Sequence, residues 1–285
     1  MPRHVVAVVA AFRPDDGFRE RVRVLLEQVE SVVIVDDGSG VPPIAEERID
    51  WIAHPTNLGI GAALNTGVAR ARSLGATHVL TLDQDTLLHP DYVASVSGAF
   101  DAATITRAGV AVADVINGVA SIPTWHSPEG LPLAPEAIQS GMLVSVDCID
   151  DAGAFDERLF IDSVDREFCH RIRERGWAVV IASGASIEHE IGRLEPLRAG
   201  GSYEWHAPFR QYYIARNGVI VARRFRHAER EWSNAMLRAT FDEARKLVRN
   251  GPRRAKHALA SGIGVLHGLV GVGGRIPRTL ERLLR

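Results

Sequence analysis

Two kinds of apolar segment alternate along the first 85 residues, and this alternation restricts the possible folds more than any other feature. Continuous apolar runs at 4–12, 31–36 and 77–83 are typical of strands buried on both faces, with a shorter run near 49–54. Segments between them, such as 57–75, carry apolar side chains at helical spacing. Strand–helix alternation predicts a Rossmann-like α/β fold, a mainly parallel sheet flanked by helices.

Pairs of aspartates follow two of the predicted strands. Asp36 and Asp37 lie in a turn before a glycine, and Asp83 and Asp85 end the strand at 77–83. Ligands of such sheets bind at the carboxyl ends of the strands, so we expect both acidic turns, on adjacent strand ends, to face one site. Two carboxylates this close repel each other unless a cation or a proton lies between them. Oxygen ligands of this kind suit Mg²⁺ or Mn²⁺.

The acidic strand end also resembles the D-x-D-x-T nucleophile motif of haloacid dehalogenase-type phosphatases. In that class the strand is normally the first of the fold, and a later lysine completes the site. Here two strand–helix units precede Asp83, and Lys246 and Lys256 are the only lysines. The pattern therefore favours an enzyme that binds a nucleotide sugar through a metal. A phosphatase and a non-catalytic nucleotide-sugar or glycan-binding protein remain as alternatives.

Composition excludes some classes of protein and compartment. The chain has 285 residues, 46% of them hydrophobic, and a net charge of −2, so nothing in the overall balance indicates nucleic acid binding. Cys148 and Cys169 are the only cysteines, too few and too far from other ligands for a zinc site. With no signal peptide apparent, the sequence predicts a reducing, cytoplasmic location, with peripheral contact to the inner face of the cell membrane as an extension of that prediction.

The last part of the chain is basic and predicted to be helical. Residues 223–256 carry eleven Arg and Lys against four acids, and the apolar segment 258–274 is broken by glycines and a histidine. That segment is a poor membrane span but can lie on a surface. We predict a helical C-terminal extension over 223–285 that contacts either an anionic membrane surface or a second subunit in a homodimer.

Six sequence blocks occur in an order and at a spacing similar to those of family 2 glycosyltransferases. They are VDDGSG, NLGIGAALNTGV, LTLDQDTLL, GAFDERLFIDSVDREFCHRIRERGW, IEHEIG and RQYYIARNGV. The chain most resembles the bacterial rhamnosyltransferase branch that builds cell-surface polysaccharide, over about residues 4–220. The resemblance implies a GT-A fold over 1–222, an inverting mechanism and a metal-bound nucleoside diphosphate sugar.

The resemblance also implies roles for residues around the nucleotide sugar. Asp37, with Asp36 as the second choice, would accept the N3–H of a uracil or thymine, although either aspartate could instead cap its own turn. Asn57 and Asn65 would face the nucleotide, although helix capping explains Asn57 equally well. Asp83 would contact the ribose and also lie beside the cation.

Further roles concern the cation and the reaction. Asp85 would bind the metal, with His189 of the block IEHEIG as a third ligand. In the block containing RLFI, read as strand-like and followed by a helix that ends at Gly176, Asp165 matches the family's catalytic aspartate. Val164 stands where many members have a glutamate, and Asp162 is the substitute candidate. Tyr213, Arg216 and Asn217 would help to close over the diphosphate or acceptor.

The resulting expectation is an inverting transferase that moves L-rhamnose from dTDP-rhamnose onto a lipid-linked or polymeric glycan. Transfer from another dTDP- or UDP-sugar, such as a galactofuranose donor, is the nearest alternative, because contacts to the base and diphosphate are shared across donors. The sequence identifies neither the donor sugar nor the acceptor.

Overall fold

A computed structural model describes residues 3–190, 194–196 and 202–285. The chain divides into two compact units, one formed by 1–156 with 165–190 and the other by 157–164 with 191–285. This division differs from the expected boundary after residue 222, because helix α6 (Pro208–Phe225) runs through that position. A separate role for residues 223–285 stays a prediction.

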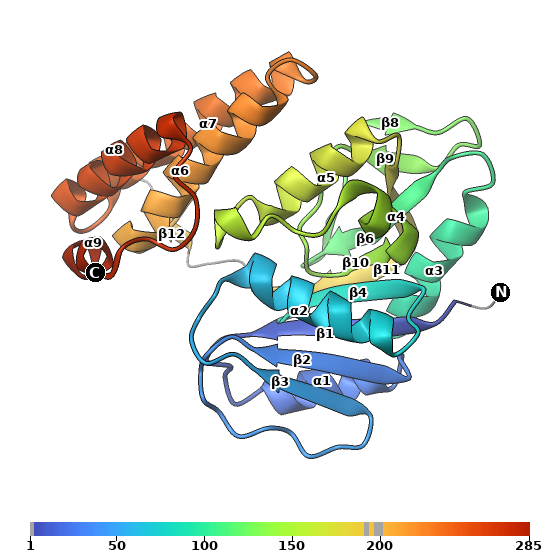
Figure 1. Cartoon of the computed structure of the whole chain (residues 1–285). Coiled ribbons are helices and arrows are strands. Elements are labelled where there is room, and N and C mark those ends of the chain that lie inside the picture. Colours follow the sequence, from blue (N-terminus) through green and yellow to red (C-terminus); the bar gives the residue numbers. More distant parts are fainter. Residues whose placement is uncertain (1–2, 191–193, 197–201) are drawn as a thin grey trace. The chain divides into compact units, whose positions relative to one another are not determined.

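The first unit contains one large sheet, and helices connect several of its strands along the sequence (Figure 1). Its strands are β1 (Val5–Ala11), β2 (Ser31–Asp36), β3 (Ile49–Ala53), β4 (His78–Asp83), β5 (Leu87–Leu88), β6 (Ala108–Ile116), β7 (Val119–Ala120), β8 (Trp125–His126), β9 (Pro132–Ala134), β10 (Met142–Ser145) and β11 (Ala178–Glu188). Its helices are α1 (Phe18–Leu26), α2 (Ile60–Ser73), α3 (Tyr92–Ala102), α4 (Val146–Ala152) and α5 (Val164–Glu174), the last of which begins one residue before the unit resumes.

The long strands of this sheet run in one direction, with β10 as the exception. The order is β3-β2-β1-β4-β10-β6-β11-β9-β8, and the pairs β3–β2, β2–β1, β1–β4 and β6–β11 are parallel. Strand β10 is antiparallel to both β4 and β6. The predicted α/β class with a mainly parallel sheet is confirmed. The two acidic turns follow β2 and β4. We expected these strands to be adjacent, but β1 lies between them and pairs with both.

Helices cover both faces of the sheet, as its buried apolar strands require (Figure 1). Helix α1 packs Phe18, Val22 and Leu25 against one face, and α3 adds Tyr92 and Val96 to the same core. Helix α2 lies on β1 and β2 from the opposite face. The strand and helix ranges read from the first 85 residues agree with the structure, and they place the acidic turns at the carboxyl edge of the sheet.

The second unit is mainly helical. It contains η1, a 3₁₀ helix (Glu157–Leu159), the hairpin strands β12 (Leu194–Pro196) and β13 (Ser202–Glu204), and helices α6, α7 (Arg230–Asn250), α8 (Arg254–Val270) and α9 (Arg278–Leu284). Side chains of α6, α8 and α9 form its core around Tyr212, Tyr213 and Ala260. The helical C-terminal part is confirmed. Within the described residues, no helix combines the length and the apolar character that crossing a bilayer needs.

The segment RLFI, expected to be strand-like, is instead the end of η1 and an irregular turn. Phe160, Asp162 and Ser163 all have φ between 64° and 67°, a left-handed conformation that non-glycine residues seldom adopt. Strand pairing needs extended backbone, so this segment cannot join a sheet. Of the apolar side chains that suggested a strand, Leu159 is buried, and Phe160 and Ile161 are partly buried against the core of the second unit.

Candidate active site

Asp83, Asp85 and His189 form a cluster at the carboxyl edge of the sheet in the first unit. One ligand atom from each lies within 4.8 Å of the others, and all three residues are partly buried. His189 Nδ1 is 3.2 Å from Asp85 Oδ1, and its Nε2 is 4.0 Å from Asp83 Oδ2. Among the described residues, these three form the one group of three or more His, Cys, Asp or Glu side chains with the spacing of a cation site. The structure therefore brings together the three predicted metal ligands.

Strand pairing explains why residues so far apart in sequence meet here. The short strand β5 pairs antiparallel with the end of β11, with Leu88 opposite Ile187 and Leu87 opposite Glu188. One further step in this register places Thr86 opposite His189, which lies 103 positions away along the chain. The histidine therefore reaches the acidic turn because the turn leads directly into a strand that pairs with β11.

Hydrogen bonds orient the imidazole of His189. Its Nδ1 is 2.8 Å from Thr86 Oγ1, so a proton on Nδ1 is donated to that hydroxyl. That tautomer leaves the lone pair of Nε2 available to a cation. Burial lowers the pKa of His189, but the nearby carboxylates of Asp85 and Asp83 outweigh it, and the pKa lies above its ordinary value.

A second set of polar residues, which the sequence analysis did not identify, supports this cluster. Asn117, after β6, exchanges two hydrogen bonds with the backbone of His189, at 2.7 and 2.8 Å. Ser140 Oγ accepts the backbone N–H of Asp83 and contacts Thr86 Oγ1 at 2.6 Å, and Gln139 Nε2 donates to Asp83 Oδ1. No strand was predicted near Asn117 or Ser140, and neither residue lies in a block of the family resemblance, so the sequence offered no local signal for them.

The residues present fit a hard divalent cation. Two carboxylates and an imidazole are ligands of Mn²⁺ and Mg²⁺ sites. Asp85 Oδ1 is buried and, although His189 Nδ1 lies 3.2 Å away, it accepts no hydrogen bond from the described residues, which is costly for a carboxylate oxygen unless something else satisfies it. A cation bound between Asp83, Asp85 and His189 would satisfy that oxygen.

The aspartates of the first acidic turn are buried and organise the backbone around them. Asp36 accepts the N–H groups of Ser39 and Gly40 at 2.9 and 3.0 Å, which closes its own turn. Asp37 accepts the N–H groups of Leu58 and Gly59, both at 2.8 Å, just before helix α2. A carboxylate has about four acceptor positions, so each aspartate retains capacity for a ligand donor. Their predicted contact with the base stays a prediction.

Histidine 54 was not identified from the sequence, and it completes the surroundings of Asp37. Its Nδ1 lies 2.8 Å from Asp37 Oδ1 and its Nε2 lies 3.0 Å from Thr66 Oγ1, with a side chain only 9% exposed. His54 follows β3 directly, so it reaches Asp37 from the neighbouring strand end. The orientation of Asp37 thus depends on a loop, a strand end and a helix.

The two predicted asparagines occupy different environments. Asn57 is partly buried in the loop between β3 and α2, directly before the N–H groups bound by Asp37. Asn65, on α2, bonds both backbone groups of Phe155, at 2.9 and 3.0 Å. These two bonds use both ends of its amide to hold the loop after α4. The predicted contacts of both residues with a nucleotide stay predictions.

The two candidate base residues differ in their partners. Asp165, in the first turn of α5, is partly buried and accepts the N–H of Arg166 at 2.8 Å. Asp162 belongs to the second unit and pairs with Arg210 at 3.0 Å. Val164 is 2% exposed, so the position where the family resemblance predicts an acid is filled by a buried apolar side chain. The ion pair gives Asp162 a structural function that does not require proton transfer.

Tyr213, Arg216 and Asn217 lie on α6 and are buried within the second unit. The Arg216 guanidinium donates to the carbonyls of Arg158, Leu159 and Gly274. Asn217 Nδ2 donates to the carbonyls of Leu159, Ile161 and Asp162, at 2.7 to 2.9 Å. The Tyr213 hydroxyl accepts the N–H of Ile276 at 2.8 Å. These bonds hold the turn before α5, and a role at the diphosphate or acceptor stays a prediction.

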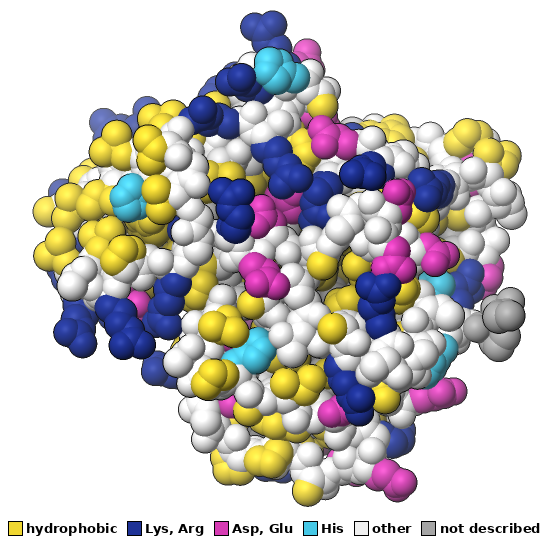
Figure 2. Space-filling view, in the orientation of Figure 1, with side chains coloured by type: hydrophobic (Ala, Val, Ile, Leu, Met, Phe, Trp, Pro, Cys, Tyr) yellow, Lys and Arg dark blue, Asp and Glu magenta, His cyan; other side chains and the backbone are white. Residues whose placement is uncertain are grey.

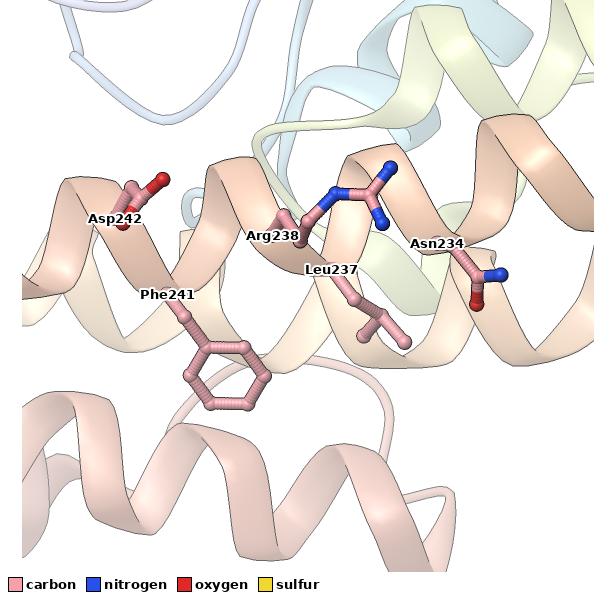
Figure 3. Close-up of a pocket in the computed structure, with 5 residues that line it drawn as sticks. All are labelled: Asn234, Leu237, Arg238, Phe241 and Asp242. Carbon is pink, nitrogen blue, oxygen red and sulfur yellow. The ribbon is translucent and has the colours of Figure 1, made fainter.

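Two parts of the predicted pattern call for separate comment. Ile191 and Gly192, which end the block IEHEIG, lie outside the described residues. A hollow along α7, shown in Figure 3, is lined by Asn234, Leu237, Arg238, Phe241 and Asp242. All five come from one helix and include a single carboxylate, so the hollow lacks the paired carboxylates and histidine found at the sheet edge.

Comparisons with known proteins agree with this geometry. The dTDP-rhamnosyl transferase RfbF of Shigella flexneri is 28% identical over 243 residues, which cover 79% of this chain and 81% of that protein. The structure of S. aureus TarS has a TM-score of 0.60 at 14% identity, covering 98% of this chain, which spans only half of the TarS chain.

A second solved structure is similar over nearly the whole chain. It is the mannosyltransferase PcManGT from Pyrobaculum calidifontis in complex with GDP-Man and Mn²⁺, with a TM-score of 0.56 at 16% identity over 99% of this chain and 85% of that one. These likenesses show that the fold is GT-A, as predicted. The model of the glycosyl transferase family 2 matches residues 6–160, more than half of the sequence. The chain therefore belongs to glycosyl transferase family 2.

Proposed function

We propose that this glycosyltransferase moves L-rhamnose from dTDP-rhamnose, with inversion, onto a lipid-linked or polymeric cell-surface glycan. The proposal rests on the cluster of Asp83, Asp85 and His189. This cluster lies in a chain that is similar over most of its length to a dTDP-rhamnosyl transferase. Family membership argues against the phosphatase alternative. Another dTDP- or UDP-sugar as donor remains the nearest competitor.

We assign the donor to the carboxyl edge of the sheet. Asp37, supported by Asp36, accepts the N3–H of the thymine from a position held by three neighbouring groups. Asn57 and Asn65 border the nucleotide, and Asp83 accepts a ribose hydroxyl. The two acidic turns are separated by one strand, a distance of about 10 Å from β2 to β4. That separation suits a ligand with a base at one end and a diphosphate at the other.

We assign the diphosphate to the cluster at the end of β4. Mg²⁺ or Mn²⁺ held by Asp85, Asp83 and His189 would neutralise charge that develops on the departing diphosphate. Thr86 and Asn117 keep the imidazole and the backbone of His189 in the orientation that this requires.

We assign the general base to Asp165. An inverting transfer needs a carboxylate on the acceptor side of the anomeric carbon. That carboxylate takes the proton of the attacking hydroxyl while the bond to the diphosphate breaks. Asp165 lies at a helix N-terminus, which favours the ionised form that a base needs.

A donor panel tests the proposal. Thermal shifts with dTDP-, UDP- and GDP-sugars, each with and without Mn²⁺, should be largest for dTDP-rhamnose with the metal, and dTDP should be released when acceptor glycan is added. A larger thermal shift and faster nucleotide release with a UDP-sugar would show that the donor is that UDP-sugar and not dTDP-rhamnose. Binding with no nucleotide release on any acceptor would favour the non-catalytic alternative.

A further inference from the structure

Helix α8 exposes a face made entirely of apolar residues. Between Ala255 and Val270, every exposed residue is alanine, leucine, glycine or valine. We call these seven residues the α8 outer face: Ala255, Ala258, Leu259, Gly262, Leu266, Leu269 and Val270. Among its leucines and valine, the largest exposed fractions are 62% for Leu266 and 75% for Val270.

The opposite face of α8 is already used inside the second unit. Ala260, Gly264 and Gly268 are buried against α6. A Cβ at Gly264 would lie 2.5 Å from the carbonyl oxygen of Tyr212, and one at Gly268 would lie 2.6 Å from that of Arg216. Packing this close requires glycine, so the orientation of α8 on α6 is well determined. The outer face therefore points away from the core of the unit for a definite steric reason.

A helix in contact with water normally has polar side chains on its exposed face. Helix α7 follows this rule, with exposed residues that include Arg230, Glu231, Arg238, Asp242 and Arg245. Helix α8 differs, since its charged residues, Arg254 and Lys256, lie in the first turn. An apolar stripe of this length on one helix marks an interaction surface.

Basic residues border the α8 outer face at both ends. Exposed Arg253 and Arg254 lie where the helix begins. At the other end, Arg223 of α6 donates to the carbonyl oxygen of Leu269, so exposed Arg223 and Arg224 lie near the last turn. Figure 2 shows hydrophobic side chains gathered over α8, with Lys and Arg side chains above and below them.

We propose that the α8 outer face docks on an anionic lipid bilayer, with its leucines and valine among the acyl chains and the flanking arginines at the headgroups. Apolar helix faces bordered by Arg and Lys bind such surfaces. A second copy of this chain is the competing occupant. Residues 223–285 carry fifteen Arg and Lys against five Asp and Glu, so two copies facing each other would repel. This inference is independent of the proposed donor and reaction.

Vesicle flotation with the full chain tests the proposal. The chain should bind phosphatidylglycerol vesicles in 50 mM NaCl and not pure phosphatidylcholine vesicles, and 500 mM NaCl should weaken binding because salt screens the arginines. The double variant Leu266→Gln with Val270→Gln should bind about tenfold more weakly, since apolar contact is lost. The control Ile122→Gln changes a side chain that is 86% exposed in the first unit, and its binding should stay at the parent level.

Charge and assembly give two further tests. Arg224→Gln with Arg254→Gln removes one exposed arginine at each end of the face, and it should weaken binding at 50 mM NaCl and reduce the salt dependence. Equal binding to both kinds of vesicle, or none to either, would overturn the proposal. Sedimentation equilibrium showing a dimer that Leu266→Gln dissociates, without vesicle binding by the parent, would assign the face to a second copy. Circular dichroism of each variant checks that the helices remain.

Discussion

At the scale of single residues, the two carboxylates after β4 have different surroundings. Asp83 Oδ1 accepts a hydrogen bond from Gln139, whereas Asp85 Oδ1 is buried with no hydrogen-bond partner among the described residues. A cation at this site would therefore change the surroundings of Asp85 more than those of Asp83. That asymmetry makes Asp85 the better residue to test.

We expect Asp85→Asn to remove the metal-dependent part of nucleotide binding. The amide keeps the shape of the side chain but loses the negative charge, so affinity for dTDP in Mn²⁺ should fall at least about tenfold. Calorimetric titration of dTDP with and without Mn²⁺ measures this. Asp101→Asn, at a side chain that is 72% exposed, is the matched control. Parent-like affinity of Asp85→Asn in Mn²⁺ would show that the metal assignment is wrong.

A second residue-scale prediction separates Asp165 from Asp162. Loss of a positioned base lowers rate by about 10²–10⁴-fold, so Asp165→Asn should reduce turnover by that order with donor affinity nearly unchanged. Asp162→Asn should affect turnover much less, because its ion pair with Arg210 serves the fold of the second unit. Single-turnover transfer and donor titration measure the two effects. The reverse result would move the base to Asp162.

At the scale of elements, the turn between η1 and α5 depends on donors from α6. Three of its residues hold left-handed backbone, a conformation that costs free energy and needs support from neighbours. Asn217 and Arg216 provide that support by binding its carbonyl oxygens. The turn therefore takes its conformation from a helix that begins almost fifty residues later.

We expect Asn217→Ala to destabilise the protein by about 1–3 kcal/mol, since buried carbonyls lose their donor. Chemical unfolding in urea measures the change in free energy of unfolding. The exposed Asn234 on α7 provides a matched control, and Asn234→Ala should change stability by less than about 0.5 kcal/mol. Equal effects from the two changes would mean that the carbonyl contacts contribute little.

At the scale of the whole molecule, His78 links stability to pH. Burial, together with Arg3, lowers the pKa of this histidine to about 4 from the ordinary 6.5. It packs edge-on against Phe100, at 4.6 Å between ring centroids. In the unfolded chain the histidine takes up a proton near pH 6.5, whereas in the folded chain it does so only near pH 4.

Stability should therefore fall as pH decreases from about 6.5 to about 4, because the unfolded state binds more protons in that interval. Above this interval the histidine is neutral in both states and has no effect. Urea midpoints at pH 7, 5.5 and 4.5 for the parent and His78→Gln measure this contribution. The variant should lose less stability on acidification, and identical losses would contradict the assigned cause.

The sequence by itself determined the features that depend on neighbours along the chain. Continuous apolar runs and helical spacing identified the strands and helices of the first 85 residues, and the aspartates after two strands located the edge of the sheet where Asp83, Asp85 and His189 lie together. Family-like blocks indicated glycosyl transferase family 2, which the comparison confirmed. Each of these signals lies within one short segment, so local reading suffices.

Only the tertiary structure decided which distant residues meet. Pairing of β5 with β11 brings His189 to Asp85, and Asn117, Ser140 and His54 act through contacts that no local pattern encodes. RLFI looked like a strand because its side chains are apolar, but donors from α6 stabilise a left-handed turn there. The apolar residues of α8 divide into a buried and an exposed face only because Gly264 and Gly268 let one side approach α6. Such contacts depend on strand register and close packing between distant segments, which the order of residues along the chain does not show.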